Sequence, residues 1–369
     1  MRVVCAVVAR PNFVKIAPIL RAFDHARRGR SDLDVRLVHT GQHYDTALSD
    51  SFFADLEIRQ PDVNLGIGSG NHAEQTARVL MAFDAILPDL RPDVVIVVGD
   101  VNSTLACALA ASKRLISVAH VEAGLRSGDR TMPEEINRLL TDAISDLLFT
   151  TSLDANRNLL AEGVAADKMF FVGNVMIDSL LRSLPRAIRP AILDTLRLQE
   201  RQFAVVTLHR PSNVDRREDA TTVLDVLEPV QEHLPIIFPM HPRSRQMFER
   251  HGLGPRLACM RGLHLVDPLG YLEFLYLLDR ARLVLTDSGG VQEETTLLGV
   301  PCLTLRPNTE RPITIIEGTN RLVGLDQAAV IAAVNDILAD RWSPGRRPDL
   351  WDGQAAGRIV EVILERCAK

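Results

Sequence analysis

The sequence predicts an α/β protein built from two Rossmann-like domains with a central cleft. Short apolar runs rich in β-branched residues alternate with amphipathic helical stretches along most of the 369 residues. This alternation is typical of serial β-α-β units and of a parallel sheet. A segment with two prolines, at residues 183–190, interrupts the alternation, and a new β-α series follows it. A break of this kind indicates a domain boundary.

The first series contains six expected strands, several of which are continuous apolar runs, as expected for strands covered on both faces. In chain order these strands are at residues 3–9, 35–39, 94–98, 117–121, 147–150 and 170–172. Helical patterns separate them at residues 14–26, 73–87, 103–111 and 135–145. The first run ends in Arg10-Pro11 without a cleavage signal, so it is expected to be a buried strand and not a secretory signal.

The second series contains five more expected strands. They are at residues 204–208, 236–240, 263–266, 283–286 and 301–305. A last helix, at about 354–367, follows a polar stretch rich in proline and glycine. We therefore expect an N-terminal domain over residues 1–182, a C-terminal domain over 183–353 and a final helix within 354–369.

Composition excludes several classes of protein. Acidic residues number 47 and basic residues 42, for a net charge of −5, whereas a general nucleic-acid binder carries a basic excess. The five cysteines are scattered, so neither a disulfide framework nor a zinc site is expected. No apolar run approaches the roughly 18 residues that span a bilayer. The expected compartment is the cytoplasm, with no membrane or nucleic-acid partner.

Ligands of open α/β sheets bind beyond the carboxyl ends of the strands, so the residues that follow each strand are the candidates for a site. Arg10 follows the first strand, where an arginine can clamp a phosphate or a carboxylate. The alternative is a surface arginine that precedes a helix.

Three carboxylates follow neighbouring strands or begin the helices after them. Asp100 follows the strand at 94–98, Glu122 ends the strand at 117–121, and Glu134 lies in the first turn of the next helix. Helix capping and the helix dipole also explain Asp100 and Glu134. Together, however, crowded carboxylates push their pKa values apart, which provides both an acid and a base.

The second half places cations and glycines after its strands. His209-Arg210 and His241 follow two successive strands, which suggests an anion site. Ser288-Gly289-Gly290 connects a strand to a helix, and backbone N–H groups at such a helix start bind phosphate. Glu294 lies far enough along that helix to reach a ribose diol. A charged loop that includes Arg311 follows the strand at 301–305.

Taken together, these residues resemble the non-hydrolysing UDP-N-acetylglucosamine 2-epimerases over essentially the whole chain. The matching motifs are Arg10-Pro11 with Lys15, Gly41-Gln42-His43, Gly99-Asp100, His120-Val121-Glu122-Ala123-Gly124-Leu125-Arg126, Pro133-Glu134-Glu135 with Asn137-Arg138, His209-Arg210, Asp287-Ser288-Gly289-Gly290 with Gln292-Glu293-Glu294, and Thr309-Glu310-Arg311-Pro312. The resemblance implies a fold like that of GT-B glycosyltransferases, a final helix that packs back on the first domain, and a homodimer. It also implies a UDP-sugar substrate and no metal or nicotinamide cofactor.

The resemblance further implies an elimination reaction. A base removes the C2 proton of the sugar while UDP leaves C1, giving 2-acetamidoglucal, and UDP adds back after reprotonation on the other face. Asp100, Glu122 and Glu134 would transfer protons and position the sugar, with base and acid left open, while Arg10 and His209 would stabilise the departing UDP. The implied substrate-binding residues are Lys15, Arg138, Phe274, Ser288, Gly289, Gly290, Glu294 and Arg311. Phe274 matches a residue near the uracil, but a core aromatic of a helix is the alternative.

The resemblance leaves the substrate and regulation open. Gln42, Arg210 and His241 match a second UDP-GlcNAc site that activates bacterial members, but the usual Arg-Gln pair is replaced around Gly70-Asn71. The opening motifs also look like those of relatives that epimerise UDP-2,3-diacetamido-glucuronate. A GT-B glycosyltransferase and a non-catalytic sensor of nucleotide sugars are the rival functions, and the three carboxylates argue against both.

Overall fold

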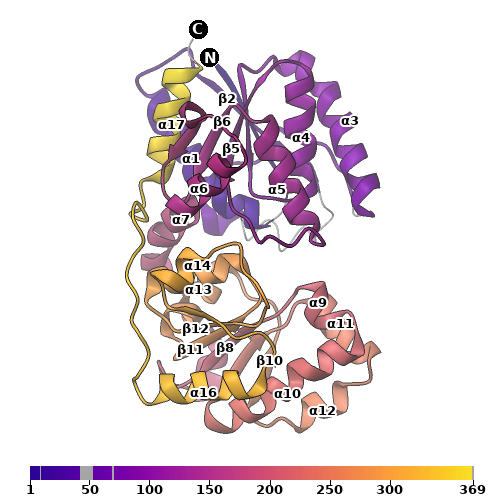
Figure 1. Cartoon of the computed structure of the whole chain (residues 1–369), viewed down its shortest axis with the longest axis vertical. Helices are drawn as coiled ribbons and strands as arrows, with labels where there is room; N and C mark the ends of the chain where they lie inside the picture. Colours follow the sequence, from indigo (N-terminus) through magenta and orange to yellow (C-terminus); the bar gives the residue numbers. More distant parts are fainter. Residues whose placement is uncertain (9, 42–52, 69, 368–369) are drawn as a thin grey trace. The chain divides into compact units, whose positions relative to one another are not determined.

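The chain consists of two compact units, each a parallel sheet covered by helices (Figure 1). The computed structural model describes residues 1–8, 10–41, 53–68 and 70–367. Unit 1 comprises Met1–Ser183 with Asp349–Lys369, and unit 2 comprises Leu184–Pro348. Every strand pair in both sheets is parallel, so the predicted α/β class is confirmed.

The sheet of unit 1 has the strand order β3-β2-β1-β4-β5-β6-β7 in the described residues. These strands are β1 (Arg2–Val7), β2 (Asp34–His39), β3 (Val63–Asn64), β4 (Val94–Val98), β5 (Ser117–Ala123), β6 (Leu147–Thr150) and β7 (Met169–Phe171). Every residue of β4 is buried, because this central strand has helices on both faces.

Helices of unit 1 connect successive strands and cover the sheet. They are α1 (Arg10–Arg27), α3 (His72–Leu90), α4 (Asn102–Lys113), α5 (Pro133–Ile144), α6 (Leu153–Ala161), α7 (Val175–Ser183) and α17 (Ala355–Arg366), with a short 3-10 helix η1 (Ala166–Lys168). Helix α3 begins at Asn71, whose side chain accepts the N–H of Glu74, and α5 begins at Pro133, whose fixed φ suits a first helical turn.

The sheet of unit 2 has the order β10-β9-β8-β11-β12-β13 in the described residues. Its strands are β8 (Ala204–Thr207), β9 (Ile236–Pro239), β10 (Leu263–Val266), β11 (Leu283–Thr286), β12 (Cys302–Thr304) and β13 (Asn320–Leu322). Its helices are η2 (Leu184–Arg186), α8 (Ala191–Thr195), α9 (Pro211–Val214), α10 (Arg217–His233), α11 (Pro242–Arg250), α12 (Gly254–Cys259), α13 (Tyr271–Arg280), α14 (Gly289–Leu298), α15 (Ile313–Ile316) and α16 (Gln327–Leu338).

Two edge strands, β3 and β13, are absent from the strands that the sequence predicts. Each has only two or three residues and is partly exposed, so neither shows the apolar run that marks a buried strand. The other strands lie within a few residues of their predicted positions, because runs of Val, Ile and Leu define them.

The last segment of the chain returns to unit 1. Helix α17 packs beside α1 and α7 (Figure 1), and Asp178 accepts the backbone N–H groups of Ala355 and Ala356 at its start. Before the helix, Trp351 is buried and its indole N–H donates to the carbonyl of Thr151 over 3.0 Å. Gly173 has φ +88°, and a Cβ there would lie 2.0 Å from the carbonyl oxygen of Leu350. Burial of Trp351 and this close approach hold the segment in place.

Both sheets reverse their order of winding at one place, which is where α/β proteins bind ligands. In unit 1 this point lies between β1 and β4, and in unit 2 between β8 and β11. Asp100 follows β4, while His209 follows β8 and Ser288 follows β11. Within the described part of the chain, no helix is long and apolar enough to cross a membrane.

Candidate active site

In unit 1, Asp100 lies against a buried arginine of α5. The Arg138 guanidinium donates from Nη1 to Asp100 Oδ2 at 2.5 Å, and the Arg138 side chain is only 2% exposed. The amide of Asn137 donates to the backbone carbonyl of Asp100 at 2.9 Å. Helix α5 therefore holds both the backbone and the carboxylate of Asp100 at the end of β4.

Glu122 lies at the end of the neighbouring strand, in an unusual backbone conformation. Its φ is +76°, a region that costs a residue with a side chain about 1–3 kcal/mol. The pairing of β5 with β6 shifts register between Val121 and Ala123, so Glu122 lies at a β-bulge. Its carboxylate is buried against Lys15 of α1, with Nζ 2.8 Å from Oε1 and 2.7 Å from Oε2. The bulge thus directs a costly buried carboxylate toward one cation.

The two adjacent acids of α5 have different environments. Glu135 is buried, accepts the N–H groups of Ser127 and Gly128, and contacts Arg138 at 2.6 Å. Burial raises the pKa of Glu135, but these donors outweigh burial and hold it below its ordinary value. Glu134 is partly exposed in the first turn of α5. Glu135 therefore holds the loop at Ser127 and Gly128, whereas the side chain of Glu134 is partly open to solvent.

A buried pair that the sequence does not reveal connects these turns. His120 of β5 contacts Asp142 of α5, with Nδ1 2.6 Å from Oδ1. The other ring nitrogen, Nε2, lies 2.9 Å from the carbonyl oxygen of Gly99. The sequence places His120 in a motif, but its partner is 22 residues away on another element, and no local pattern predicts that pairing.

In unit 2, the buried carboxylate of Asp287 organises the loop after β8. It accepts the backbone N–H groups of His209 and Arg210 and the side-chain amide of Asn213. It also contacts His209 Nδ1 at 3.1 Å, and the His209 side chain is 54% exposed. Burial would raise the pKa of Asp287, but His209 and these N–H groups hold it below its ordinary value. Asp287 therefore stays ionised and fixes the orientation of His209.

The start of α14 lies over a buried cluster of charged side chains. Ser288 is the N-cap residue, and Gly289 and Gly290 form the first turn. A Cβ at Gly289 would lie 2.3 Å from Arg311 Nη1, so a larger residue there would displace the Arg311 side chain. Arg311 Nε lies 3.0 Å from Glu293 Oε1, and Glu310 pairs with both Arg306 and Arg311. This network holds Arg311 beneath a helix start whose first N–H groups have no partner within the helix.

Glu294 of α14 and Phe274 of α13 differ in burial and in charge. Glu294 is buried, and burial together with Glu293 raises its pKa to about 8. Tyr271 is close enough that Glu294, after burial, raises the pKa of the tyrosine as well. Phe274 is partly buried and packs on the apolar core cluster that includes Leu277 and Leu278.

Of the remaining predicted residues, two have side chains that the structure does not describe and two have described contacts. Gln42 lies outside the described residues, and for Arg10 the structure describes only the backbone, at the first position of α1. Arg210 turns inward, with Nε 3.1 Å from the carbonyl oxygen of Asp287 and Nη2 3.5 Å from Glu310. His241 caps α11, where its Nδ1 accepts the N–H of Arg243.

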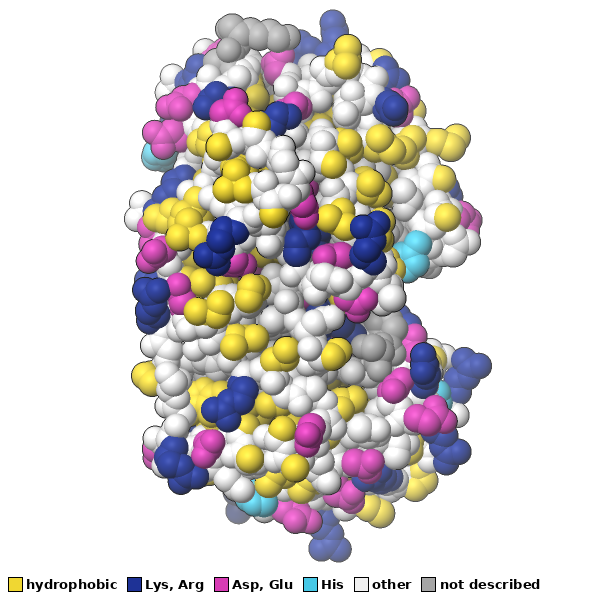
Figure 2. Space-filling model, viewed as in Figure 1, with side chains coloured by type: hydrophobic (Ala, Val, Ile, Leu, Met, Phe, Trp, Pro, Cys, Tyr) yellow, Lys and Arg dark blue, Asp and Glu magenta, His cyan; other side chains and the backbone are white. Residues whose placement is uncertain are grey.

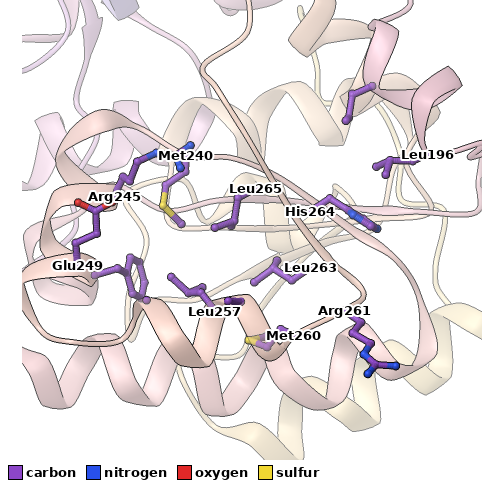
Figure 3. A pocket seen from close by; sticks show the side chains of 14 residues that line it. Leu196, Met240, Arg245, Glu249, Leu257, Met260, Arg261, Leu263, His264 and Leu265 are labelled. Atoms are coloured by element: carbon purple, nitrogen blue, oxygen red, sulfur yellow. The ribbon is translucent and has the colours of Figure 1, made fainter.

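A cavity of about 610 Å³ in unit 2 lies away from these residues. It is bordered by β10, α11 and α12, with Met240, Phe248 and Leu265 in its lining (Figure 3). None of the predicted site residues lines it. Among the described residues, no group of three or more His, Cys, Asp or Glu side chains could hold a metal ion.

Acidic and basic side chains are interspersed on the face drawn in Figure 2. This distribution matches the near balance of charge in the composition. The face drawn therefore shows no large area of a single charge sign.

Comparison with known proteins identifies the family. The family model described as UDP-N-acetylglucosamine 2-epimerase matches residues 25–364. A UDP-N-acetylglucosamine 2-epimerase of Methanocaldococcus jannaschii is 42% identical over 96% of this chain and 96% of its own. A UDP-2,3-diacetamido-2,3-dideoxy-D-glucuronate 2-epimerase of Pseudomonas aeruginosa is 40% identical over 99% of this chain and all of its own. The chain belongs to the UDP-N-acetylglucosamine 2-epimerase family, whose members are enzymes that invert C2 of a nucleotide sugar.

Solved structures agree with this assignment. The crystal structure of the M. jannaschii enzyme in complex with UDP-GlcNAc and UDP matches with a TM-score of 0.91 and 41% identity, covering 99% of this chain and 100% of that one. A sucrose-phosphate synthase from Thermosynechococcus elongatus matches with a TM-score of 0.59 at 14% identity. This second match shows that the fold is shared with that protein, and it shows the fold alone.

Proposed function

We propose that this enzyme interconverts UDP-GlcNAc and UDP-ManNAc by eliminating UDP to give 2-acetamidoglucal and adding it back. The C2 proton goes to a base of the protein, and the electron pair of the C2–H bond forms the C1=C2 double bond. The electron pair of the breaking C1–O bond leaves with UDP. Reprotonation of C2 on the opposite face and re-addition of UDP complete the inversion. The M. jannaschii relative is named as a UDP-N-acetylglucosamine 2-epimerase, and the similar crystal structure contains UDP-GlcNAc and UDP. Both support the assignment.

The observation that carries the proposal is the arrangement of carboxylates in unit 1. Asp100 follows β4 and Glu122 lies near the end of the adjacent strand β5, and each is paired with a buried cation, Arg138 and Lys15 respectively. Glu134 lies on the same helix as Arg138. We assign proton transfer at C2 and sugar positioning to these carboxylates, because inversion needs an acid and a base in defined orientations.

Unit 2 would hold the nucleotide. The N–H groups at the start of α14, with Ser288 as N-cap, favour the diphosphate, and His209 would donate to it as it leaves. Because Asp287 contacts Nδ1 of His209, Nε2 is the ring nitrogen that would face the substrate. Glu294, Phe274 and Arg311 would contact the ribose and the base, and Arg10 the diphosphate.

The test is incubation of the enzyme with UDP-GlcNAc in D2O. The proposal predicts deuterium at C2 of both epimers and the appearance of UDP-ManNAc. A parallel incubation with UDP-2,3-diacetamido-glucuronate addresses the second candidate, which the 40% identical P. aeruginosa relative favours. Exchange with that sugar and none with UDP-GlcNAc would transfer the assignment to the diacetamido-uronate. Transfer of the sugar to an acceptor without C2 exchange would indicate a glycosyltransferase.

A homodimer, a cytoplasmic location and a role in supplying precursors of polysaccharides are further parts of the proposal. Exposed apolar side chains on or beside three neighbouring helices of unit 1 support the dimer: Met81 is 70%, Leu115 96% and Leu140 48% exposed. Light scattering of the full chain checks the dimer. Activation by a second UDP-GlcNAc, bound through Gln42, Arg210 and His241, predicts a sigmoidal dependence of rate on substrate.

A further inference from the structure

Both ring nitrogens of His120 face hydrogen-bond acceptors. Nδ1 lies 2.6 Å from Asp142 Oδ1, and Nε2 lies 2.9 Å from the backbone carbonyl oxygen of Gly99. The side chain of His120 is fully buried and that of Asp142 is 1% exposed, so water does not substitute for either partner. A carbonyl oxygen only accepts, and therefore Nε2 carries a proton.

The second proton of the pair is shared between Nδ1 and Asp142, and the surroundings of Asp142 place it on the ring. The other carboxylate oxygen, Oδ2, accepts the backbone N–H of Gly124 at 3.0 Å and lies 2.7 Å from Arg126 Nη2. Both donors favour the ionised carboxylate. Burial alone would raise the pKa of Asp142, but His120 and Arg126 hold it below its ordinary value. The geometry thus requires two N–H donors on one imidazole.

We propose that His120 is a positioning residue held as an imidazolium, which fixes the turn that carries Asp100. The proposal rests on the proposed function for its consequence, namely that the turn positions a carboxylate for proton transfer at C2. The protonation state itself follows from the contacts of His120 and Asp142.

The turn after β4 is held on both sides by β5. Gly99 has φ +70°, its N–H donates to the carbonyl of Val121 at 3.1 Å, and its own carbonyl accepts from His120. Both ends of the Gly99 residue are therefore fixed by consecutive residues of β5. Since Asp100 is the next residue, the direction of its side chain depends on the Gly99 carbonyl.

Asp142 extends the same connection to the second carboxylate. Its Oδ2 accepts the N–H of Gly124, two residues after Glu122 at the β-bulge. Helix α5 supplies Asp142 and also Arg138, which contacts Asp100. The pair therefore joins the turn of Asp100, the bulge of Glu122 and the helix of Glu134.

The charged groups around the pair come from each neighbouring segment. Arg126 follows β5 and contacts both Asp142 and Glu162, which ends α6. The turns that the His120–Asp142 pair connects carry two carboxylates, Asp100 and Glu122. Lys15 of α1 neutralises Glu122. Arg126 already compensates part of the negative charge on Asp142, so loss of the imidazolium charge leaves the carboxylate partly paired.

Nitrogen NMR of the full-length enzyme, labelled with ¹⁵N-histidine, tests the protonation state without reference to activity. The proposal predicts that both ring nitrogens of His120 show a directly bonded proton throughout the range from pH 6 to pH 8. The spectrum of His120→Asn assigns the signal by its disappearance. One protonated and one bare ring nitrogen at pH 7 would overturn the proposal.

Two neutral substitutions separate the contacts. His120→Gln retains a donor toward the Gly99 carbonyl, and His120→Asn retains one toward Asp142. Displacement of a catalytic group by about 1 Å can cost on the order of 100-fold in rate, so we expect kcat to fall about 10- to 100-fold in His120→Asn and less in His120→Gln. KM for UDP-GlcNAc should change less than about 3-fold, and the matched surface control His25→Gln should behave as wild type.

The outcomes distinguish this inference from the proposed function. Wild-type kcat in both His120 variants, or a rise in KM with kcat unchanged, would overturn the positioning role. If the wild-type enzyme exchanges no C2 proton in any UDP-sugar, the proposed function fails while the NMR result still decides the protonation state. If the His120 variants do not fold, the other histidines are substituted one at a time, and the signal that persists in every variant assigns His120 in the wild-type spectrum.

Discussion

In the part of the chain that the structure describes, each unit has a histidine–aspartate pair at the end of its sheet, and the two pairs differ in burial. In unit 1, His120 is fully buried and both of its ring nitrogens face acceptors. In unit 2, His209 is 54% exposed, and its Nδ1 contacts Asp287. The same two types of side chain thus connect parts of the protein in unit 1, whereas in unit 2 we propose that the histidine donates to the diphosphate.

The comparison shows that burial, and not residue type, decides the role of such a pair. A buried imidazole with two acceptors has no group left for a substrate. A half-exposed imidazole held at one nitrogen by a carboxylate has its other nitrogen oriented and available. Replacing each member of each pair therefore separates an effect on folding from an effect on the reaction.

The largest effect on the reaction is expected from His209→Asn. Loss of the donor to the departing diphosphate should lower kcat/KM about 10²- to 10⁴-fold, while the melting temperature stays within about 2 °C because the ring is half exposed. Initial rates with UDP-GlcNAc and thermal unfolding provide the check. A fall in stability comparable to that of an Asp142 variant would remove the contrast between the two pairs.

The largest effect on stability is expected from Asp142→Ala. It leaves two cations, His120 and Arg126, in buried surroundings, and breaking such a pair costs about 3–5 kcal/mol. Asp287→Ala leaves two backbone N–H groups and a half-exposed imidazole, for a cost of about 1–3 kcal/mol. Urea unfolding of both variants measures the difference. Equal losses of unfolding free energy in the two variants would show that burial of the imidazole does not determine how much each aspartate stabilises the fold.

Acid should destabilise both pairs. The pKa of Asp142 and that of Asp287 are held below the ordinary value in the folded protein. Their contributions, about 1–3 kcal/mol each, are therefore fully present above about pH 4 and are lost as pH falls through the folded pKa values. The midpoint of urea unfolding, measured from pH 6 to pH 3, reports this loss. In Asp287→Asn the midpoint should depend less on pH than it does in the wild type. A midpoint independent of pH would contradict the ion pairing.

Glu294 in unit 2 should show the opposite dependence of stability on pH. Burial and Glu293 raise its pKa to about 8, so the folded protein favours the neutral acid and loses stability as pH rises from about 4 through 8. We expect Glu294→Gln to be more stable than wild type at pH 8, by up to about 4 kcal/mol, and to differ little from wild type at pH 4. A variant less stable than wild type at pH 8 would show that Glu294 is ionised when buried.

The sequence predicts most of the fold because its signals are local. Strand β4 is five consecutive Val and Ile residues, all buried, and no helix can be inferred from so short a β-branched run. The same logic places Asp100 and Glu122 at neighbouring strand ends. Edge strands β3 and β13 are not predicted, because a strand of two or three residues is too short to show an alternating hydrophobic pattern.

The partners of the site residues could not be predicted, because they depend on contacts between distant segments. Asp142 is unremarkable within the amphipathic pattern of α5, and only the fold brings it to His120. Arg311 is identifiable as a cation of a loop, but its position between Glu293 and Glu310 requires the packing of α14 on that loop. The positive φ of Glu122 likewise cannot be predicted from the sequence, because glycine is the residue type that indicates such a conformation.

Glu134→Gln tests most directly the central claim, that unit 1 moves the C2 proton while unit 2 holds UDP. The measurement is the rate of deuterium incorporation at C2 of UDP-GlcNAc in D2O, together with UDP affinity by calorimetry. The account predicts that exchange falls about 10²-fold or more while the affinity for UDP stays within about 3-fold of wild type. Wild-type exchange in this variant would contradict it.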